Sequence, residues 1–380
     1  MGGAAHLPLK DGRRMRIAQI APLAESCPPR LYGGTERVVS YLTEELVAQG
    51  HEVTLFASGD SITSAELAAC SERALRLSED VRDALPHHMI MLEKVMRRAH
   101  EFDVLHFHID LMHAPVVRDF AQRTLTTLHG RLDLPDLPPF FRTFSRLPLV
   151  SISDFQRRPL PPVNWAATIY HGLPSNTLTF NAGKREDYLA FLGRISPEKR
   201  PDRAIEIAAK SGMRLKIAAK IDRADQAYWD ERIAPLIRAH ANVEYIGEIN
   251  EQEKSAFLGN AHALLFPIDW DEPFGLVMIE AMACGTPVIA YGRGSVPEII
   301  DHGQSGFIVS SIDGAVRAVA AVPLLDRARV RHIFERRFTV ERMTRDYVDL
   351  YRRQIAAHAI GDLPAASAPI ASAQGAALAV

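Results

Sequence analysis

Short apolar strand-like segments alternate with helix-like segments along this chain, and the alternation starts again near its middle. The first series opens with a strand over residues 15–20, a loop, and a helix over about 35–49. The second series opens in the same way, with a strand over 188–192, a loop, and a helix over 201–210. Strands that alternate with helices form parallel sheets covered by helices. The sequence therefore predicts an α/β protein built from two doubly wound sheets.

The two halves are expected to form separate domains, because 380 residues exceed what one compact core usually contains. We predict Rossmann-like domains over 15–180 and 181–339, with an N-terminal tail over 1–14 and a disordered tail over 357–380. Such sheets bind ligands at the carboxyl ends of their strands, so a cleft between the two facing sheets is the expected site. Further strands are predicted at 52–57, 103–107, 124–128, 149–152, 167–170, 214–218, 243–246, 263–266, 287–290 and 306–309.

The charge balance and the cysteines limit the partners of the protein. Lys and Arg number 44 and Asp and Glu number 46, so no general basic surface for nucleic acid is expected. Cys27, Cys70 and Cys284 form no CxxC pair and no metal-ligand spacing, which favours a reducing, cytoplasmic compartment. Residues 1–14 lack a signal-peptide core, and no run approaches the roughly 18 apolar residues of a membrane span. Peripheral membrane contact stays open, and nothing indicates the oligomeric state.

The segment EPFGLVMIEAMACGTPVIA, residues 272–290, carries the most specific chemical pattern. Pro273 keeps Glu272 out of a helix, and a very apolar short helix follows from Gly275, with Glu280 its one ionisable group. Burying that carboxylate is costly unless a group donates to it, such as the hydroxyls of a ribose diol. The amides of Phe274, Gly275 and Leu276 would face an anion at the helix start. The alternative is that Glu280 pairs with a neighbouring Arg and Glu272 is solvated.

The segment GRISPEK, residues 193–199, places two cations after the first strand of the second series. Arg194 follows the strand directly, and Lys199 lies in the loop beyond it. Cations in this position can clamp a diphosphate and neutralise it as it leaves. A solvated loop is the alternative interpretation of the same two residues.

The segment YGGTER, residues 32–37, brings Gly33 and Gly34 to the start of the first helix. Without side chains, their amides could approach a phosphate or a sugar closely, although a glycine pair also occurs in simple turns. This segment is therefore a supporting signal for an anion site.

Several histidines follow strands of the first series. His129 ends one predicted strand, and His106, His108 and His113 cluster after another, together with Asp110. The density invites a zinc hypothesis, but His106 and His108 share one strand face and no fixed ligand frame completes a site. We therefore expect structural or substrate-contacting histidines and no metal.

Taken together, these motifs resemble those of retaining glycosyltransferases of family 4, over roughly residues 15–353. The resemblance is carried by YGGTER, TLHG, GRISPEK, the Glu272–Glu280 pair and GSVPEII at 294–300, and the avilamycin-type bacterial subgroup is the nearest match. It implies the GT-B fold, two facing Rossmann-like domains with an interdomain cleft. It also implies that a helix over 340–356 crosses back to the first domain.

The resemblance implies a role for each matching residue. In the second domain, Arg194 and Lys199 would bind the diphosphate and Glu280 the ribose, while Glu272 and the amides of Phe274, Gly275 and Leu276 would contact the transferred sugar and phosphate. In the first domain, Gly33 and Gly34 would line the diphosphate, and His129 would approach the sugar near its 6-position. The residues expected to act in catalysis are His129, Arg194, Lys199 and Glu272.

The same resemblance implies a metal-independent hexosyl transfer from a nucleotide-diphosphate sugar, with retention of configuration and no cofactor. The base pocket is expected near Lys220 and residues 247–249, the donor is expected to be UDP-glucose, and the acceptor is unidentified. One departure is YHGLP at 170–174, where His171 stands in place of a family Asn, so no role is carried onto that segment. A sugar-nucleotide epimerase or a non-catalytic sugar-nucleotide-binding protein on the same fold remains the alternative.

Overall fold

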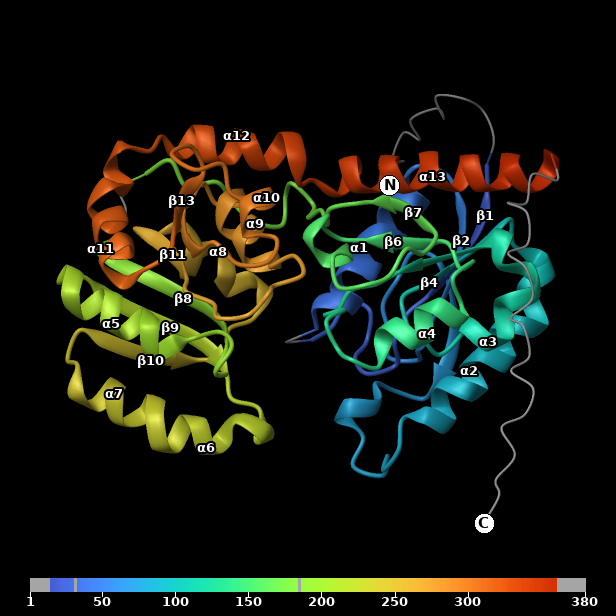
Figure 1. Cartoon of the computed structure of the whole chain (residues 1–380), viewed down its shortest axis with the longest axis horizontal. Helices are drawn as coiled ribbons and strands as arrows, with labels where there is room; N and C mark the ends of the chain where they lie inside the picture. Colours follow the sequence, from blue (N-terminus) through green and yellow to red (C-terminus); the bar gives the residue numbers. More distant parts are fainter. Residues whose placement is uncertain (1–13, 31–32, 184–185, 361–380) are drawn as a thin grey trace, which may run out of the picture.

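Two parallel sheets form the two halves of the molecule in the computed structural model, which describes residues 14–30, 33–183 and 186–360 (Figure 1). The first sheet has seven strands in the order β3-β2-β1-β4-β5-β6-β7, over the described residues. The second has six, in the order β10-β9-β8-β11-β12-β13. Every pairing recorded between these strands is parallel, as the alternation of strands and helices predicts.

The strands lie close to their predicted positions, with two differences. The strands of the first sheet are β1 (Arg16–Ile20), β2 (Glu52–Ser58), β3 (Glu66–Ser71), β4 (Val104–Phe107), β5 (Thr124–Thr127), β6 (Leu149–Ser151) and β7 (Trp165–Thr168). The strands of the second sheet are β8 (Tyr188–Arg194), β9 (Arg214–Lys220), β10 (Val243–Gly247), β11 (Ala263–Phe266), β12 (Val288–Tyr291) and β13 (Gly306–Val309). The sequence did not indicate β3, a half-exposed edge strand whose ELAACS sequence has little β propensity. The strand predicted over 167–170 begins two residues earlier, because Trp165 already pairs with Leu149 of β6.

Helices cover both faces of each sheet. They are α1 (Gly34–Ala48), α2 (Leu85–Arg98), α3 (Ala114–Val117), α4 (Leu137–Thr143), α5 (Pro201–Ser211), α6 (Gln226–Tyr228), α7 (Ala234–Ala239), α8 (Glu251–Gly259), α9 (Leu276–Ala283), α10 (Val296–Ile299), α11 (Ile312–Ala321), α12 (Arg327–Arg337) and α13 (Val340–Ile360). The chain reverses its direction across each sheet at the first strand, between β1 and β4 and between β8 and β11. Ligand crevices of doubly wound sheets lie at such switch points, beyond the carboxyl ends of the strands.

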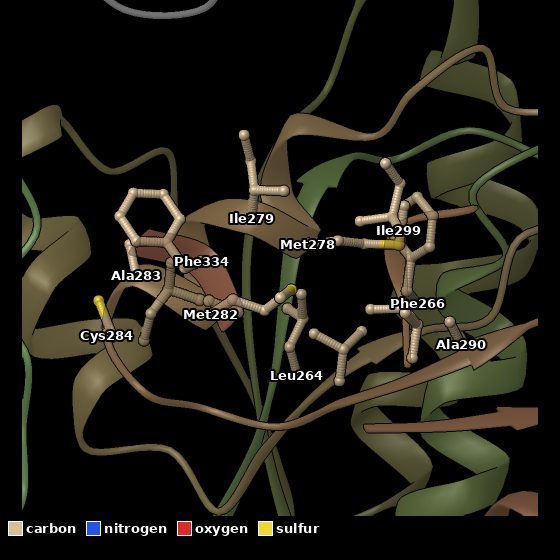
Figure 2. Close-up of a cluster of buried hydrophobic side chains, with 14 of the residues drawn as sticks. Leu264, Phe266, Met278, Ile279, Met282, Ala283, Cys284, Ala290, Ile299 and Phe334 are labelled. Atoms are coloured by element: carbon tan, nitrogen blue, oxygen red, sulfur yellow. The ribbon is translucent and has the colours of Figure 1, made fainter. Parts of the chain in front are cut away.

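The helix α9 is strongly apolar, and most of it is packed inside the protein. Figure 2 shows its Met278, Ile279 and Met282 among side chains such as Leu264 of β11 and Phe334 of α12. All five side chains are buried. Fully burying one such side chain stabilises the fold by about 1.5–3 kcal/mol. The helix that carries Glu280 is therefore held rigidly against the sheet.

The helix α13 lies along the first domain, although it follows the second domain in sequence (Figure 1). Its buried Met343, Tyr347 and Leu350 pack in one core cluster with Ile17 and Leu42 of the first domain. It runs to Ile360, four residues beyond the predicted boundary at 356, so the tail predicted from 357 begins inside the helix. Residues 1–13 and 361–380 of the two predicted tails lie outside the described residues.

The two chain crossings between the domains touch each other. The amide of Leu173 donates to the carbonyl of Phe338, and the amide of Val340 donates to the carbonyl of Leu173, at 2.9 Å each. A Cβ on Gly172 would lie 2.2 Å from the carbonyl oxygen of Thr339, so only glycine permits this approach. The YHGLP segment thus serves as one half of the interdomain crossing.

Candidate functional site

A cleft of about 540 Å³ lies between the two domains and is lined by residues of both. Every site residue predicted from the sequence lines it. These residues are Gly33, Gly34 and His129 of the first domain and Arg194, Lys199, Glu272, Phe274, Gly275, Leu276 and Glu280 of the second. The cleft lies beyond the ends of β8 and β11, the switch point of the second sheet.

The turn before α9 places backbone amides at the cleft. Gly275 has φ of 81°, and a Cβ there would meet Met278 Cε at 2.7 Å, so another side chain would be both strained and crowded. The hydroxyls of Ser153 and Ser295 donate to the carbonyls of Pro273 and Phe274, at 2.6 and 2.9 Å. The first amides of a helix have no intrahelical acceptor, and they attract anions. The structure therefore supports an anion site at this helix start.

The GSVPEII segment packs against that turn and supports it. A Cβ on Gly294 would lie 2.3 Å from the backbone oxygen of Glu272, and the amide of Ser295 donates to the same oxygen at 2.9 Å. Glu298 reaches the first domain, where it accepts bonds from the amide of Phe155 and the hydroxyl of Tyr170, at 2.7 and 3.0 Å. This motif positions the loop and contacts the first domain without lining the cleft.

Glu272 is buried and paired rather than solvated. Lys199 Nζ donates to Glu272 Oε2, and Trp270 Nε1 donates to the same oxygen at 3.1 Å. The ammonium of Lys199 also lies 5.0 Å from the Trp270 ring centroid, a cation–π distance. The solvated alternative for Glu272 is therefore wrong, and Lys199 is already paired with a carboxylate at the cleft.

Arg194 is likewise held by carboxylates. Its NH1 lies 3.5 Å from Asp222 and 3.9 Å from Asp225, and Lys220 also contacts Asp222, at 3.0 Å. Its Nε is buried and has no hydrogen-bond partner among the described residues. Arg194 thus lines the cleft with its charge balanced by carboxylates.

Glu280 pairs with a lysine, and not with the arginine that the alternative interpretation expected. Lys254 Nζ donates to Glu280 Oε1 at 2.7 Å and lies 3.2 Å from Glu251 Oε2. The same oxygen of Glu251 accepts from Arg37 NH1 of the first domain at 2.5 Å. A line of alternating charges therefore runs from the cleft across the domain boundary, in the order Glu280, Lys254, Glu251 and Arg37.

Sequence reasoning missed three members of this line, Arg37, Glu251 and Lys254. Asn250 and Glu253 form a capping box, a sequence signal that marks the start of α8 and so the neighbourhood of Lys254. Arg37 stands in the YGGTER motif, where only the glycines were interpreted. Glu251 and Lys254 are a local pair three positions apart, but no local pattern could have joined them to Arg37 or to Glu280, which lie far away in the sequence.

The glycine pair brings α1 close to the second domain. An added Cβ on Gly34 would lie 3.6 Å from Leu276 Cδ1, and one on Gly33 would meet Pro29 Cβ at 2.7 Å. Gly34 opens α1, so two helix starts, those of α1 and α9, face the same cleft. Tyr32 of the same motif lies outside the described residues.

The predicted histidine cluster is a hydrogen-bonded network behind the cleft wall. His129 Nε2 lies 2.9 Å from His108 Nδ1, and the ring centroids of His106 and His108 are 4.0 Å apart. Burial lowers the pKa of His129 to about 3 and the pKa of His106 well below its usual value, so these rings are neutral near pH 7. His171, which received no role from the sequence, stacks near His129 with centroids 5.3 Å apart.

Within the described part of the chain, no group of three or more His, Cys, Asp or Glu side chains is arranged to hold a metal ion. Both ring nitrogens of His106 and of His108 already have hydrogen-bond partners. None of the described helices is both long and apolar enough to cross a membrane.

Comparison with protein families gives a match for each half of the chain. Residues 32–170 match the model "Glycosyltransferase Family 4", and residues 179–329 match "Glycosyl transferases group 1". The two matches lie on the two sheets described above.

Two curated relatives illustrate the range of similarity. The phosphatidyl-myo-inositol mannosyltransferase of Mycobacterium leprae is 25% identical over 357 residues, covering 84% of this chain and 90% of that protein. The D-inositol 3-phosphate glycosyltransferase of Mycobacterium marinum is 34% identical over 194 residues, covering 47% of this chain. That match spans only 40% of the length of the relative.

Solved structures share the two-domain architecture. AviGT4, a glycosyltransferase involved in avilamycin A biosynthesis, aligns with a TM-score of 0.69 at 26% identity, covering 90% of this chain and 98% of its own. Sucrose-phosphate synthase from Thermosynechococcus elongatus aligns with a TM-score of 0.74 at 18% identity, covering 90% and 100%. HepE from Anabaena, solved with UDP and glucose, aligns with a TM-score of 0.67 at 18% identity, covering 90% and 100%.

Proposed function

The chain belongs to glycosyltransferase family 4 and has the GT-B fold, and we propose that it transfers a hexose from a nucleotide-diphosphate sugar to a hydroxyl of an acceptor, with retention of configuration. The observation that carries this proposal is the composition of one interdomain cleft. Two helix starts, cations that include Arg194 and Lys199, and the buried carboxylates of Glu272 and Glu280 line it together, and this set suits a diphosphate joined to a ribose.

The diphosphate would bind between the start of α9 and the cations Arg194 and Lys199. Both cations are balanced by carboxylates in the structure, Arg194 by Asp222 and Lys199 by Glu272. A diphosphate offers more charge than either carboxylate, so it can replace them without leaving a buried cation unpaired. The displaced Glu272 would then be available to the hydroxyls of the transferred sugar.

The ribose diol would bind to Glu280. Lys254 occupies Oε1 of this carboxylate, and no described residue donates to Oε2. Lys254 pairs with one oxygen of this carboxylate, and a carboxylate accepts hydrogen bonds from hydroxyls strongly. The base would lie toward Lys220, Glu248 and Ile249, which line the same cleft.

The chemical step needs stabilisation of the departing diphosphate. Arg194 and Lys199, together with the amides of Phe274, Gly275 and Leu276, would supply it without a metal or a cofactor. Removing one such donor from other enzymes costs about 2.7–4 kcal/mol in the transition state. We propose front-face attack through an oxocarbenium-like state, in which the leaving phosphate accepts the acceptor proton and His129 shapes the sugar site.

UDP-glucose is the donor that we propose, and the structure of HepE with UDP and glucose supports it. A mannosyl donor is the second candidate, favoured by the name of the Mycobacterium leprae relative. A cytoplasmic location is also proposed, because Cys27, Cys70 and Cys284 are all free, buried thiols.

Calorimetric titration with UDP, GDP, ADP and NAD in EDTA tests the donor site. We expect one nucleoside diphosphate to bind selectively and the Arg194→Ala variant to bind it at least tenfold more weakly. The donor sugar then follows from a screen with the matching nucleotide sugars, and anomeric proton NMR of the product reads the stereochemistry. Binding of NAD alone, or of no nucleotide, would contradict the proposal, and an isomerised donor without acceptor would favour the epimerase.

A further inference from the structure

A chain of hydrogen bonds leads from His129 at the cleft into the first domain. His129 Nε2 lies 2.9 Å from His108 Nδ1, and His108 Nε2 lies 2.8 Å from Gln19 Oε1. Gln19 Nε2 then donates to the hydroxyl of Tyr351 on α13, at 3.1 Å. Gln19 of β1 and the residues His108 and His129, which follow β4 and β5, thus connect to the crossing helix behind the cleft wall.

The chain continues beyond Tyr351 without a break. The hydroxyl of Tyr351 lies 2.7 Å from His106 Nδ1, and His106 Nε2 lies 2.7 Å from Thr127 Oγ1. Thr127 Oγ1 lies 2.9 Å from the hydroxyl of Tyr347, again on α13. The members behind His129 are almost wholly buried. They are Gln19, His106, Thr127 and Tyr351 at 0% exposure, Tyr347 at 1% and His108 at 2%.

The members of this chain cannot choose their hydrogen-bond directions independently. Burial lowers the pKa of His106 and of His108 well below the usual value, so each ring is neutral and has one N–H donor and one lone-pair acceptor. A hydroxyl has a single hydrogen to donate, and a buried polar group without a partner is costly. Setting the direction of one bond therefore sets the directions of its neighbours.

Gln19 is the group that sets the direction, because its two amide atoms differ in kind. Its Oε1 can only accept and its Nε2 can only donate. Oε1 faces His108, so His108 Nε2 carries the hydrogen and His108 Nδ1 is an acceptor. His129 must then donate to His108 from Nε2, which leaves Nδ1 of His129 with a lone pair.

We propose that Gln19 and Tyr351 are positioning residues that hold His129 as the Nε2–H tautomer, so that His129 presents an Nδ1 lone pair to a hydroxyl of the bound ligand. This atom has no hydrogen-bond partner among the described residues, and His129 lines the cleft. A hydroxyl can donate to the lone pair, whereas a carbonyl or phosphate oxygen in its place would be repelled. Only the identification of the ligand as a sugar rests on the proposed function.

Nitrogen NMR of the ligand-free, full-length protein, labelled with ¹⁵N-histidine, measures this tautomer directly. His129 is assigned through the His129→Gln variant. At neutral pH we expect a protonated-type signal for Nε2 and an unprotonated-type signal for Nδ1. A protonated Nδ1 in the wild-type protein overturns the proposal.

The variants Gln19→Leu and Tyr351→Phe test the positioning role, and either suffices where the other fails to fold. Each removes hydrogen bonds of the chain at similar side-chain volume. We expect the two nitrogen signals of His129 to move toward the averaged values of mixed tautomers. Catalytic efficiency should fall about tenfold, as for one misdirected hydrogen bond. His129 signals that stay unchanged in both variants overturn the proposal.

Thr126 and Thr127 offer a matched control on β5. Both are wholly buried, but Thr126 Oγ1 bonds His113 Nε2 at 2.7 Å, outside the chain. Thr127→Val is expected to shift the His106 signals and, less strongly, those of His129, while Thr126→Val leaves His129 unchanged. Equal shifts of His129 in both variants would indicate a general packing effect and contradict the proposal.

The NMR result and the proposed function can be contradicted independently of each other. Because the spectra are recorded without ligand, a protein that binds no nucleotide but shows the expected tautomer contradicts only the proposed function. A protein that binds UDP normally but has a protonated Nδ1 on His129 contradicts only this inference. Nucleotide affinity is expected to stay within about twofold in Gln19→Leu, since the diphosphate contacts lie on the other domain.

Discussion

The second-domain wall of the cleft and the network behind His129 in the first domain differ in how their polar side chains are satisfied. On the second domain they are charged and held in ion pairs. These pairs are Arg194 with Asp222, Lys199 with Glu272, and Lys254 with Glu280. On the first domain the side chains behind His129 are neutral, buried and joined in a directional hydrogen-bond chain. The ion pairs of the second domain can be exchanged for contacts with a charged ligand, whereas the hydrogen-bond chain of the first domain fixes the orientation of His129.

This difference teaches how one cleft can hold a charged donor and still select among neutral hydroxyls. In an ion pair at a cleft each charge neutralises the other, and a ligand of higher charge can replace one partner. A neutral hydrogen-bond chain gives little attraction at a distance, but it fixes which atom donates and which accepts. We therefore expect variants of the charged wall to change affinity most, and variants of the neutral wall to change hydrogen-bond direction.

The largest expected effect on the charged wall comes from Arg194→Ala. Because one anion-stabilising donor contributes about 10²–10³ in rate, we expect kcat/KM to fall by about that factor. Steady-state kinetics with the identified donor measure it. Arg200→Ala is the matched control, since Arg200 pairs with Asp202 in the same region and does not line the cleft. Comparable losses in both variants would remove Arg194 from the site.

Glu280→Gln is expected to weaken nucleoside diphosphate binding by roughly 10- to 100-fold, the value of a hydrogen bond to a charged group. The amide keeps the volume of the side chain but removes the charge that Lys254 balances. Calorimetry with the diphosphate and with its 2′-deoxy analogue separates the contribution of the 2′-hydroxyl contact from that of the rest of the nucleotide. A deoxy analogue that loses no more affinity in the wild type than in the variant would contradict the ribose contact.

The buried, neutral histidines of the first domain predict a pH dependence of stability. Burial lowers the pKa of His113 and of His129 from 6.5 to about 3, so the unfolded chain binds protons before the folded one does. The free energy of unfolding should therefore fall as the pH drops from about 6.5 toward 3, by up to about 2 kcal/mol per histidine between pH 6.5 and 5. Urea unfolding at a series of pH values measures this slope. His113→Gln should reduce it, and an unchanged slope would contradict the neutral, buried state of that ring.

The smallest effect is expected from Glu251→Gln, which weakens the charged line between the domains. Glu251 is partly exposed, so screening by solvent limits its pair with Arg37. We expect a loss of about threefold in kcat/KM at low salt that disappears at high salt. A large loss that persists at high salt would instead indicate that Glu251 contacts the substrate.

Much of the site was predictable because its motifs are local. Gly275 must be a glycine for its own backbone conformation, and Arg194 follows directly from the strand β8. The apolar sequence around Glu280 also predicted a short, very apolar helix. Short-range rules of this kind require no knowledge of the rest of the chain.

The partners of these residues were not predictable in the same way. Lys254 lies 26 positions before Glu280, and Arg37 lies 214 positions before Glu251. Neither pair belongs to a common strand or helix, so no periodicity in the sequence joins them. The edge strand β3 was not predicted, because its half-exposed small residues show no clear alternation of apolar and polar positions.

The sequence by itself determined the two doubly wound sheets, the glycine turn before α9 and several of the residues that line the cleft. These follow from hydrophobic periodicity and from backbone rules that act over a few residues. Only the tertiary structure decided which charges neutralise one another, and that Gln19, His108 and Tyr351 stand in line behind His129. Hydrogen-bond direction and ion pairing depend on distances of a few ångströms between remote parts of the chain, and packing of the whole fold sets those distances.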